Sequence, residues 1–98
     1  MRITSGTLKN KKIKSREGNE TRPTLERIKE AIFSIIGDKV VESKFLDLYS
    51  GTGNMAIEAL SRGAKRAILI EKNQEALRII IENINDCKLE NKSGYFCQ

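Results

Sequence analysis

With 98 residues, 39% of them hydrophobic, the chain can form one small globular unit with a modest core, and it contains no run of about 18 apolar residues that could span a membrane. It has no histidine and two cysteines ten positions apart, Cys87 and Cys97, which argues against a zinc set or a Cys–His nucleophile and indicates free thiols and no metal. The net charge of +5 is uneven, because residues 1–29 hold nine Lys and Arg against three acids whereas residues 30–98 hold nine against ten.

The first 22 residues form a basic arm in this interpretation. Two short stretches, Arg2–Ser5 and Lys11–Lys14, flank a polar turn, and the alternation of apolar residues predicts a short hairpin or an extended arm. Such a basic segment is typical of proteins that contact a phosphate backbone, although a merely solvated surface arm is the alternative. The segment lacks the apolar region of a secretory signal, so we expect a cytoplasmic protein, while composition also allows a basic organellar leader.

A helix is predicted next, starting at Pro23 and Thr24 and stopping at Gly37. Its isoleucines recur at helical spacing, which predicts a single apolar stripe that packs on the core, formed by Ile28, Ile32, Ile35 and Ile36. The charged residues between them are then expected to face solvent or a partner, namely Arg27, Lys29 and Glu30.

Strands and helices alternate through the rest of the chain. Lys44–Leu48 reads as a strand buried on both faces apart from its acid, Asn54–Arg62 as a helix, and Ala67–Ile70 as a second strand. A third helix is expected after Asn73, and a third strand starts near Tyr95. The alternation predicts an α/β fold with right-handed crossovers and a parallel sheet. Three strands are few for a doubly wound sheet, so residues 23–98 are interpreted as its amino-terminal, cofactor-binding half.

The stretch from Phe45 to Leu60, FLDLYSGTGNMAIEAL, places a glycine turn between a strand and a helix. Gly51 and Gly53 allow a sharp turn and a close approach of the backbone to a ligand. Asp47 lies four residues before Gly51, and Glu71 lies 20 residues after it, at the end of the second strand. A carboxylate at that strand end suits ribose hydroxyls, and one near the turn suits a cationic group, so a nucleotide-like cofactor is predicted. A tight turn without a ligand is the alternative.

The same stretch resembles the first motif of class I S-adenosylmethionine-dependent methyltransferases, an acid followed after three residues by Gly-x-Gly. The motif EALSRGA at residues 58–64 narrows the resemblance to the bacterial family that methylates the exocyclic N2 amine of a guanine in 16S ribosomal RNA. Further matches are the start MRI, Ser5-Gly6, TRPT at residues 21–24, Arg27, Glu30-Ala31 and Phe33. The match extends from Met1 to about Asn83. It is weak after Cys87, and Asn10 stands where the family usually has glycine.

The resemblance implies a role for each matching position. Asp47, Gly51 and Gly53 would surround the methionine part of S-adenosylmethionine, with Ser50 and Asn54 beside them. Glu71 would hold the ribose hydroxyls. Asn73 would lie near the adenosine edge, and capping the third helix is an equally good explanation of that residue. The cations expected to face ribosomal RNA of the small subunit are Arg2, Lys9, Lys11, Lys12 and Arg22.

No catalytic residue is predicted. Related amino-methyltransferases use an Asp/Asn-Pro-Pro-aromatic motif to hold the acceptor base, whereas Pro23 is the single proline of this sequence. We therefore expect a fragment that binds the cofactor but does not transfer methyl groups alone. The target nucleotide and the oligomeric state are left open.

Three other functions fit part of the pattern. Gly51-x-Gly53-x-x-Ala56 with Glu71 also satisfies the fingerprint of an NAD-dependent oxidoreductase, although Asp47 and the basic arm argue against it. A DNA amino-methyltransferase would share the first motif. A non-catalytic RNA-binding module would keep RNA affinity with a steep salt dependence and no affinity for the cofactor.

Overall fold

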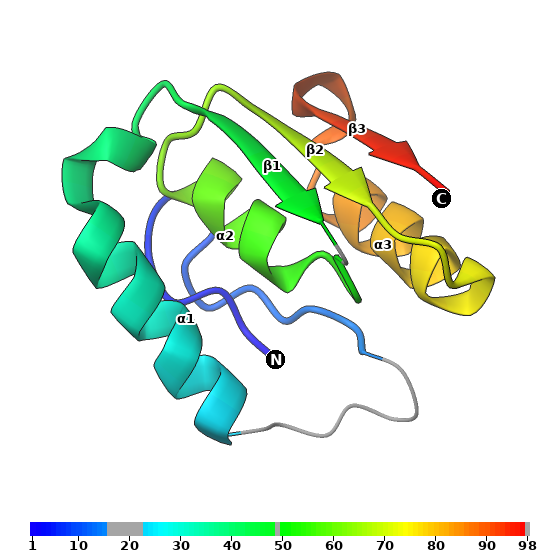
Figure 1. The fold of residues 1–98 in the computed structure, drawn as a ribbon, viewed down its shortest axis with the longest axis horizontal. Helices are drawn as coiled ribbons and strands as arrows, with labels where there is room; N and C mark the ends of the chain where they lie inside the picture. Colours follow the sequence, from blue (N-terminus) through cyan, green and yellow to red (C-terminus); the bar gives the residue numbers. More distant parts are fainter. Residues whose placement is uncertain (16–22, 49, 98) are drawn as a thin grey trace.

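A three-stranded parallel sheet organises the fold (Figure 1), in a computed structural model that describes residues 1–15, 23–48 and 50–97. The elements in chain order are α1 (Pro23–Ile36), the 3-10 turn η2 (Gly37–Val40), β1 (Lys44–Leu48), α2 (Asn54–Ser61), β2 (Arg66–Ile70), α3 (Gln74–Asp86), the 3-10 turn η3 (Glu90–Lys92) and β3 (Ser93–Phe96). The strands lie in the order β1-β2-β3, with Lys44 beside Arg66 and Ala67 beside Ser93. The predicted α/β fold is confirmed, and the element boundaries agree with the sequence signals to within two residues.

Helices α2 and α3 cover one face of the sheet. Leu69 of β2 is completely buried and belongs to one apolar cluster with Ile57 of α2 and with Ile80 and Ile84 of α3. Side chains of a strand point alternately to its two faces, so this cluster assigns both helices to the face that carries Leu69. The core of the domain lies between this face and the two helices.

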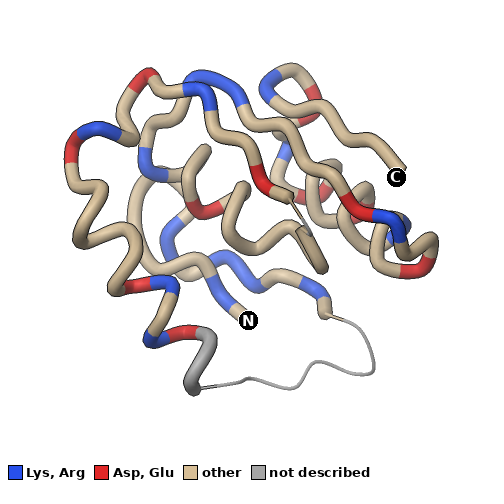
Figure 2. The backbone as a smooth tube through the Cα atoms, in the orientation of Figure 1, with Lys and Arg blue, Asp and Glu red and all other residues tan. Residues whose placement is uncertain are grey.

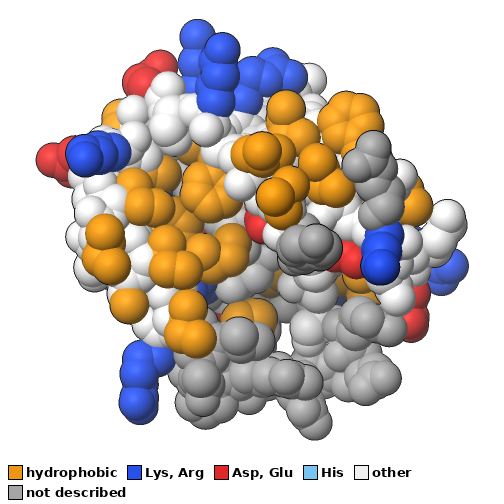
Figure 3. Space-filling view, viewed as in Figure 1, with side chains coloured by type: hydrophobic (Ala, Val, Ile, Leu, Met, Phe, Trp, Pro, Cys, Tyr) orange, Lys and Arg blue, Asp and Glu red, His pale blue; other side chains and the backbone are white. Residues whose placement is uncertain are grey.

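The opposite face of the sheet is apolar and exposed. Leu46 is 60% exposed, Leu48 is 56% exposed and Ile68 is 40% exposed, and Figure 3 shows hydrophobic side chains gathered on this side of the molecule. The prediction that β1 is buried on both faces is therefore wrong. The run of apolar residues is typical of a strand between two layers, but in the described part of the chain only one layer of helices covers the sheet.

Helix α1 buries a different stripe from the predicted one. Lys29 and Phe33 face the interior with 1% and 2% exposure, whereas Ile28, Ile32 and Ile35 are 48%, 36% and 84% exposed. The prediction that Lys29 faces solvent or a partner is wrong, and of the four isoleucines predicted to pack on the core only Ile36 does so. Two stripes at helical spacing run along α1, and contacts with other segments decide which of them is buried. Phe33 stacks on the ring of Phe45 in β1, and Lys29 pairs with the buried Glu58.

The described part of the arm, residues 1–15, folds back on itself. Arg2 and Lys12 form an antiparallel bridge, and the Ile3 amide donates to the Lys11 carbonyl at 2.9 Å. Ile3 and Ile13 are buried, which pins the arm to the helices, while its Lys and Arg residues, whose positions along the backbone Figure 2 marks, are exposed. The predicted basic hairpin is thus present in outline. Arg22 lies outside the described residues.

Candidate cofactor site

The glycine turn between β1 and α2 has two glycines with different tasks. Gly51 and Gly53 have φ angles of 60° and 85°, which side-chain-bearing residues rarely adopt. A β-carbon at Gly53 would lie 3.2 Å from Leu69 Cδ2, so Gly53 lets the turn pack closely on the sheet. A β-carbon at Gly51 would meet no heavy atom within 4 Å. Gly51 therefore faces open space, where a ligand could approach the backbone.

Glu71 joins the turn to the end of β2. Its Oε1 accepts a hydrogen bond from the Gly51 amide at 2.8 Å, and its Oε2 accepts one from the Asn73 amide at 3.0 Å. The carboxylate is half-buried and held in place by two backbone donors. The acid that sequence spacing placed beside the glycine turn is thus in contact with it.

Asp47 carries a carboxylate oxygen that lacks a partner. Oδ2 is buried and has no hydrogen bond among the described residues. Burial raises the pKa of Asp47 to about 6, and the charge of Glu71 adds to the rise, while hydrogen bonds from Ser50 and the Ala56 backbone oppose it. A buried oxygen without a donor is costly, so this position favours a ligand that brings a cation or a donor.

Three other predicted site residues use their side chains within the protein. The Ser50 hydroxyl donates to the Asp47 carbonyl at 2.8 Å, and Asn54 Oδ1 accepts from Lys29 Nζ at 3.4 Å. Asn73 Oδ1 accepts from the Ala76 amide at 2.9 Å and so caps α3, which was the alternative explanation for that residue. These side chains shape the site, and their contact with a ligand stays a prediction.

The cations predicted to face RNA are exposed where the structure describes them. They are Arg2, Lys9, Lys11 and Lys12, all on the arm. Lys14, which was not predicted, is instead held by acids of α3, with Nζ 3.0 Å from Glu82 Oε1 and 3.8 Å from Asp86 Oδ2. The outward cations of the arm are therefore available to phosphates, whereas Lys14 anchors the arm.

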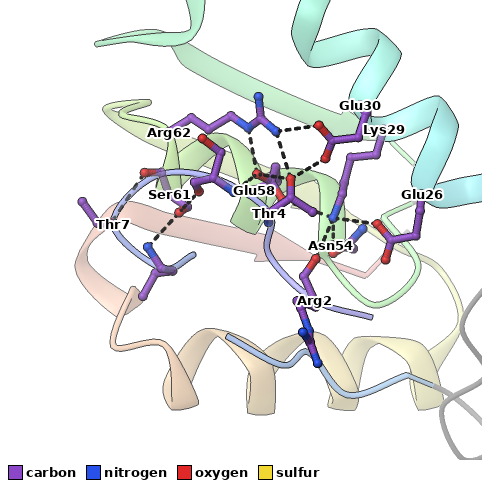
Figure 4. Close-up of polar contacts among 12 residues, drawn as sticks. Arg2, Thr4, Thr7, Glu26, Lys29, Glu30, Asn54, Glu58, Ser61 and Arg62 are labelled. Atoms are coloured by element: carbon purple, nitrogen blue, oxygen red, sulfur yellow. Dashed lines mark hydrogen bonds and ion pairs between the residues drawn. The ribbon is translucent and has the colours of Figure 1, made fainter. Parts of the chain in front are cut away.

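A buried ionic cluster lies behind the site (Figure 4), and the sequence analysis missed it. Glu58 is fully buried, and its carboxylate meets Lys29 Nζ at 3.1 Å and Arg62 Nε at 2.7 Å. Burial alone would raise the pKa of Glu58, but the hydrogen bonds from Arg62 and the Thr4 amide and the charge of Lys29 outweigh it, so this pKa is lowered. A Glu–Arg pair four residues apart in an otherwise apolar helix was the available signal.

The same cluster ties α1 and the arm to the start of α2. Besides Glu58, Lys29 Nζ meets the Arg2 carbonyl at 2.9 Å and Glu26 Oε1 at 3.4 Å, in addition to its contact with Asn54. Arg62 stacks over the Phe33 ring with 4.6 Å to the centroid. The helix that begins at the glycine turn is thus held by charged side chains of α1 and by backbone groups of the arm.

Residues 1–15, 23–48 and 50–97 contain neither a candidate metal site nor a candidate membrane-spanning helix. No group of three or more His, Cys, Asp or Glu side chains there could hold a metal ion. No helix in those ranges combines the length and the hydropathy that crossing a membrane requires.

Comparison with known proteins decides the family. The family described as "Conserved hypothetical protein 95" matches residues 1–97. The chain belongs to this family. It is 37% identical over 89 residues to "Putative rRNA methyltransferase YlbH" of Bacillus subtilis, and the matched region covers 91% of this chain and 48% of that protein. It is 32% identical over 91 residues to ribosomal RNA small subunit methyltransferase D of Escherichia coli K12, and the matched region covers 93% of this chain and 46% of that protein.

A solved structure agrees. The "Putative methyltransferase yhhF" of Escherichia coli superposes with a TM-score of 0.89 at 30% identity, over 100% of this chain and 52% of that one. The predicted membership of an rRNA methyltransferase family is confirmed, and so is the methyltransferase fold. The chain spans about half the length of the curated relatives named above.

Proposed function

We propose that this chain is the cofactor-binding part of an enzyme that transfers a methyl group from S-adenosylmethionine to N2 of a guanine in small-subunit rRNA. The observation that carries the proposal is the buried Oδ2 of Asp47, which has no hydrogen-bond partner within residues 1–15, 23–48 and 50–97, next to a glycine turn that opens at Gly51. An anion in that position suits the cationic part of S-adenosylmethionine, which an NAD cofactor lacks at the corresponding place.

Each part of the cofactor then has a partner of matching chemistry. The ammonium group of the methionine part would face Asp47, the rest of the methionine part would lie along Gly51 and Gly53, and the ribose hydroxyls would donate hydrogen bonds to Glu71. Ser50 and Asn54 would hold the turn, and Asn73 would lie beside the adenosine edge. When bound, the sulfonium supplies an already activated methyl group, so the protein mainly has to align the acceptor amine.

The basic arm is proposed to bind rRNA of the small subunit. The exposed arm cations named above and Arg22 would contact phosphates, which position the substrate without reading its sequence. We propose that the chain divides into an arm, residues 1–22, and a partial Rossmann-like domain, residues 23–98. We also propose a cytoplasmic location, which fits an rRNA substrate. Because the sequence lacks an Asp/Asn-Pro-Pro-aromatic motif, we propose that these 98 residues do not transfer methyl groups by themselves.

Titration calorimetry tests the cofactor. S-adenosylhomocysteine is expected to bind and NADH is not, and Glu71→Ala is expected to weaken S-adenosylhomocysteine about tenfold or more, since hydrogen bonds to a charged group contribute about 1.5–3 kcal/mol. The matched control is Glu90→Ala, an exposed acid in η3, where the affinity should stay unchanged. Binding of NADH alone would overturn the proposal. RNA affinity without S-adenosylhomocysteine affinity would favour a non-catalytic RNA-binding module.

The raised pKa of Asp47 predicts how binding depends on pH. A cationic ligand group prefers the ionised carboxylate, so protonation of Asp47 below about pH 6 competes with binding. S-adenosylhomocysteine should therefore bind about tenfold more weakly at pH 5 than at pH 7.5. Asp47→Asn removes the charge and should give weak binding with a flat profile over that range. A wild-type affinity that does not change with pH would refute the role of Asp47.

A further inference from the structure

Asn83 is a buried polar residue on the face of α3 that packs into the core. It is 1% exposed and lies in α3 between Ile80 and Ile84, which pack into the core. Burying an amide is costly unless all its groups are paired, so its partners matter. They lie in two distant segments, the arm and the glycine turn.

Three hydrogen bonds define the geometry. Asn83 Oδ1 accepts from the Lys14 amide at 2.9 Å, and its Nδ2 donates to the Lys14 carbonyl at 3.0 Å. These two hydrogen bonds pair the Asn83 side-chain amide with the Lys14 backbone N–H and C=O, as a neighbouring strand would, and so fix the end of the described arm. The same Nδ2 donates to the Thr52 carbonyl at 2.9 Å, between the two glycines of the turn. One side chain thus joins the arm to the centre of the cofactor turn.

The other end of the arm is anchored to the helix that leaves the same turn. The Thr4 and Ser5 amides donate to the Glu58 carboxylate at 3.0 and 3.2 Å. Lys29 Nζ contacts both the Arg2 carbonyl and Asn54, the first residue of α2. The arm is therefore held on both sides of its turn by elements that shape the cofactor site.

The proposed RNA-binding cations lie next to these anchors. Arg2 provides the carbonyl that Lys29 holds, and it pairs with Lys12, which stands two residues before the Lys14 backbone that Asn83 holds. A phosphate that restrains these cations also restrains the anchored backbone. Because Asn83 connects that backbone to Thr52, the restraint reaches the glycine turn.

We propose that Asn83 is a positioning residue that couples RNA binding on the arm to cofactor binding at the glycine turn. This inference rests on the proposed function. RNA that orders the arm should order the Thr52 carbonyl and with it the turn, and the cofactor then binds a site that is already arranged. By thermodynamic linkage, the cofactor must raise RNA affinity by the same factor.

A binding cycle tests the coupling. The affinity of S-adenosylhomocysteine is measured with and without a saturating mixed-sequence single-stranded RNA, on the 98-residue chain. For the wild type we expect RNA to increase the affinity about fivefold or more, the usual lower end of coupling between two sites. For Asn83→Ala we expect a ratio near one. Partial loss of fold alone would raise the ratio, because saturating RNA pulls unfolded chains back to the folded state, so a ratio near one in Asn83→Ala reports lost coupling and not lost fold.

The matched control is Asn85→Ala, an exposed asparagine of the same helix, which should keep the wild-type ratio. A measurement on the wild type covers the case in which Asn83→Ala fails to fold: RNA should slow hydrogen exchange of the amides at residues 50–54. Independent binding of the two ligands to the wild type, or a wild-type ratio in Asn83→Ala, would overturn this inference alone. Failure of S-adenosylhomocysteine to bind the wild type would overturn the proposed function as well.

Discussion

Replacing Glu58 by alanine is expected to lower the free energy of unfolding by about 3–5 kcal/mol, the cost of breaking a buried ion pair from one side. The variant removes the nearer of the two carboxylate partners of Lys29 Nζ, which is 1% exposed, and leaves only Glu26 at 3.4 Å. It also releases Arg62 Nε and the Thr4 and Ser5 amides. For a domain of this size, thermal unfolding monitored by circular dichroism should show a midpoint lower by about 12 °C or more.

The control is Glu30→Ala. Glu30 also pairs with Arg62, at 3.5 Å, but its side chain is 49% exposed, so this substitution should cost less than about 1 kcal/mol. A further variant separates charge from packing: Lys29→Met combined with Glu58→Leu removes both charges and should recover much of the loss. Equal destabilisation by Glu58→Ala and Glu30→Ala would contradict the importance given to burial.

Acid should weaken the same cluster. The pKa of Glu58 is lowered in the folded chain, so its contribution to stability is complete above the ordinary pKa of 4.5 and is lost as the pH falls through the lowered value. This part of the acid sensitivity should be absent from Glu58→Gln, which cannot titrate.

Alanine at Gly6 is expected to detach the arm from α2. Gly6 has a φ of 88°, and a β-carbon there would lie 1.9 Å from the Ser61 carbonyl oxygen, a backbone atom that cannot give way cheaply. The hydrogen bonds that hold the arm at this point run from the Thr7 amide to the Ser61 carbonyl and from the Leu8 amide to Ser61 Oγ, both 2.9 Å long. We expect a loss of about 3 kcal/mol or more, measured by urea denaturation.

Gly37→Ala is the matched control for backbone strain. Gly37 has a φ of 57°, and a β-carbon there would meet nothing within 4 Å, so the change should cost only about 1–2 kcal/mol. Hydrogen exchange should show faster exchange of the arm amides in Gly6→Ala alone. Similar losses in both variants would mean that left-handed strain accounts for the effect and that the close approach to Ser61 does not.

Several parts of the site were accessible from the sequence because their chemistry is local. The glycine turn needs left-handed backbone at Gly51 and Gly53, and those residues stand between an apolar run and a helical pattern. Glu71 contacts Gly51 because the carboxyl ends of neighbouring parallel strands meet at one edge of the sheet. The N-cap role of Asn73 likewise depends on the three residues that follow it.

Other parts depend on contacts that sequence spacing does not encode. Lys29 looked like a surface residue because its helix contains an alternative apolar stripe, and its burial follows from Glu58, which stands 29 positions later. Asn83 sits on an apolar helix face, and its partners Lys14 and Thr52 are 69 and 31 positions away. That Asp47 Oδ2 lacks a partner in the described part of the chain is a property of its surroundings, which a motif does not describe.

The sequence by itself determined the order of strands and helices, their boundaries at Pro23 and Gly37, the glycine turn with its two acids, and the family, because each follows from backbone chemistry within a few residues or from matching motifs. Only the tertiary structure decided which stripe of α1 is buried, that one face of the sheet stays exposed at Leu46 and Leu48, and that the arm is joined to the glycine turn through Asn83. The physical reason is that burial and pairing depend on which distant segments meet, and a buried polar group takes its role from the partner that satisfies it.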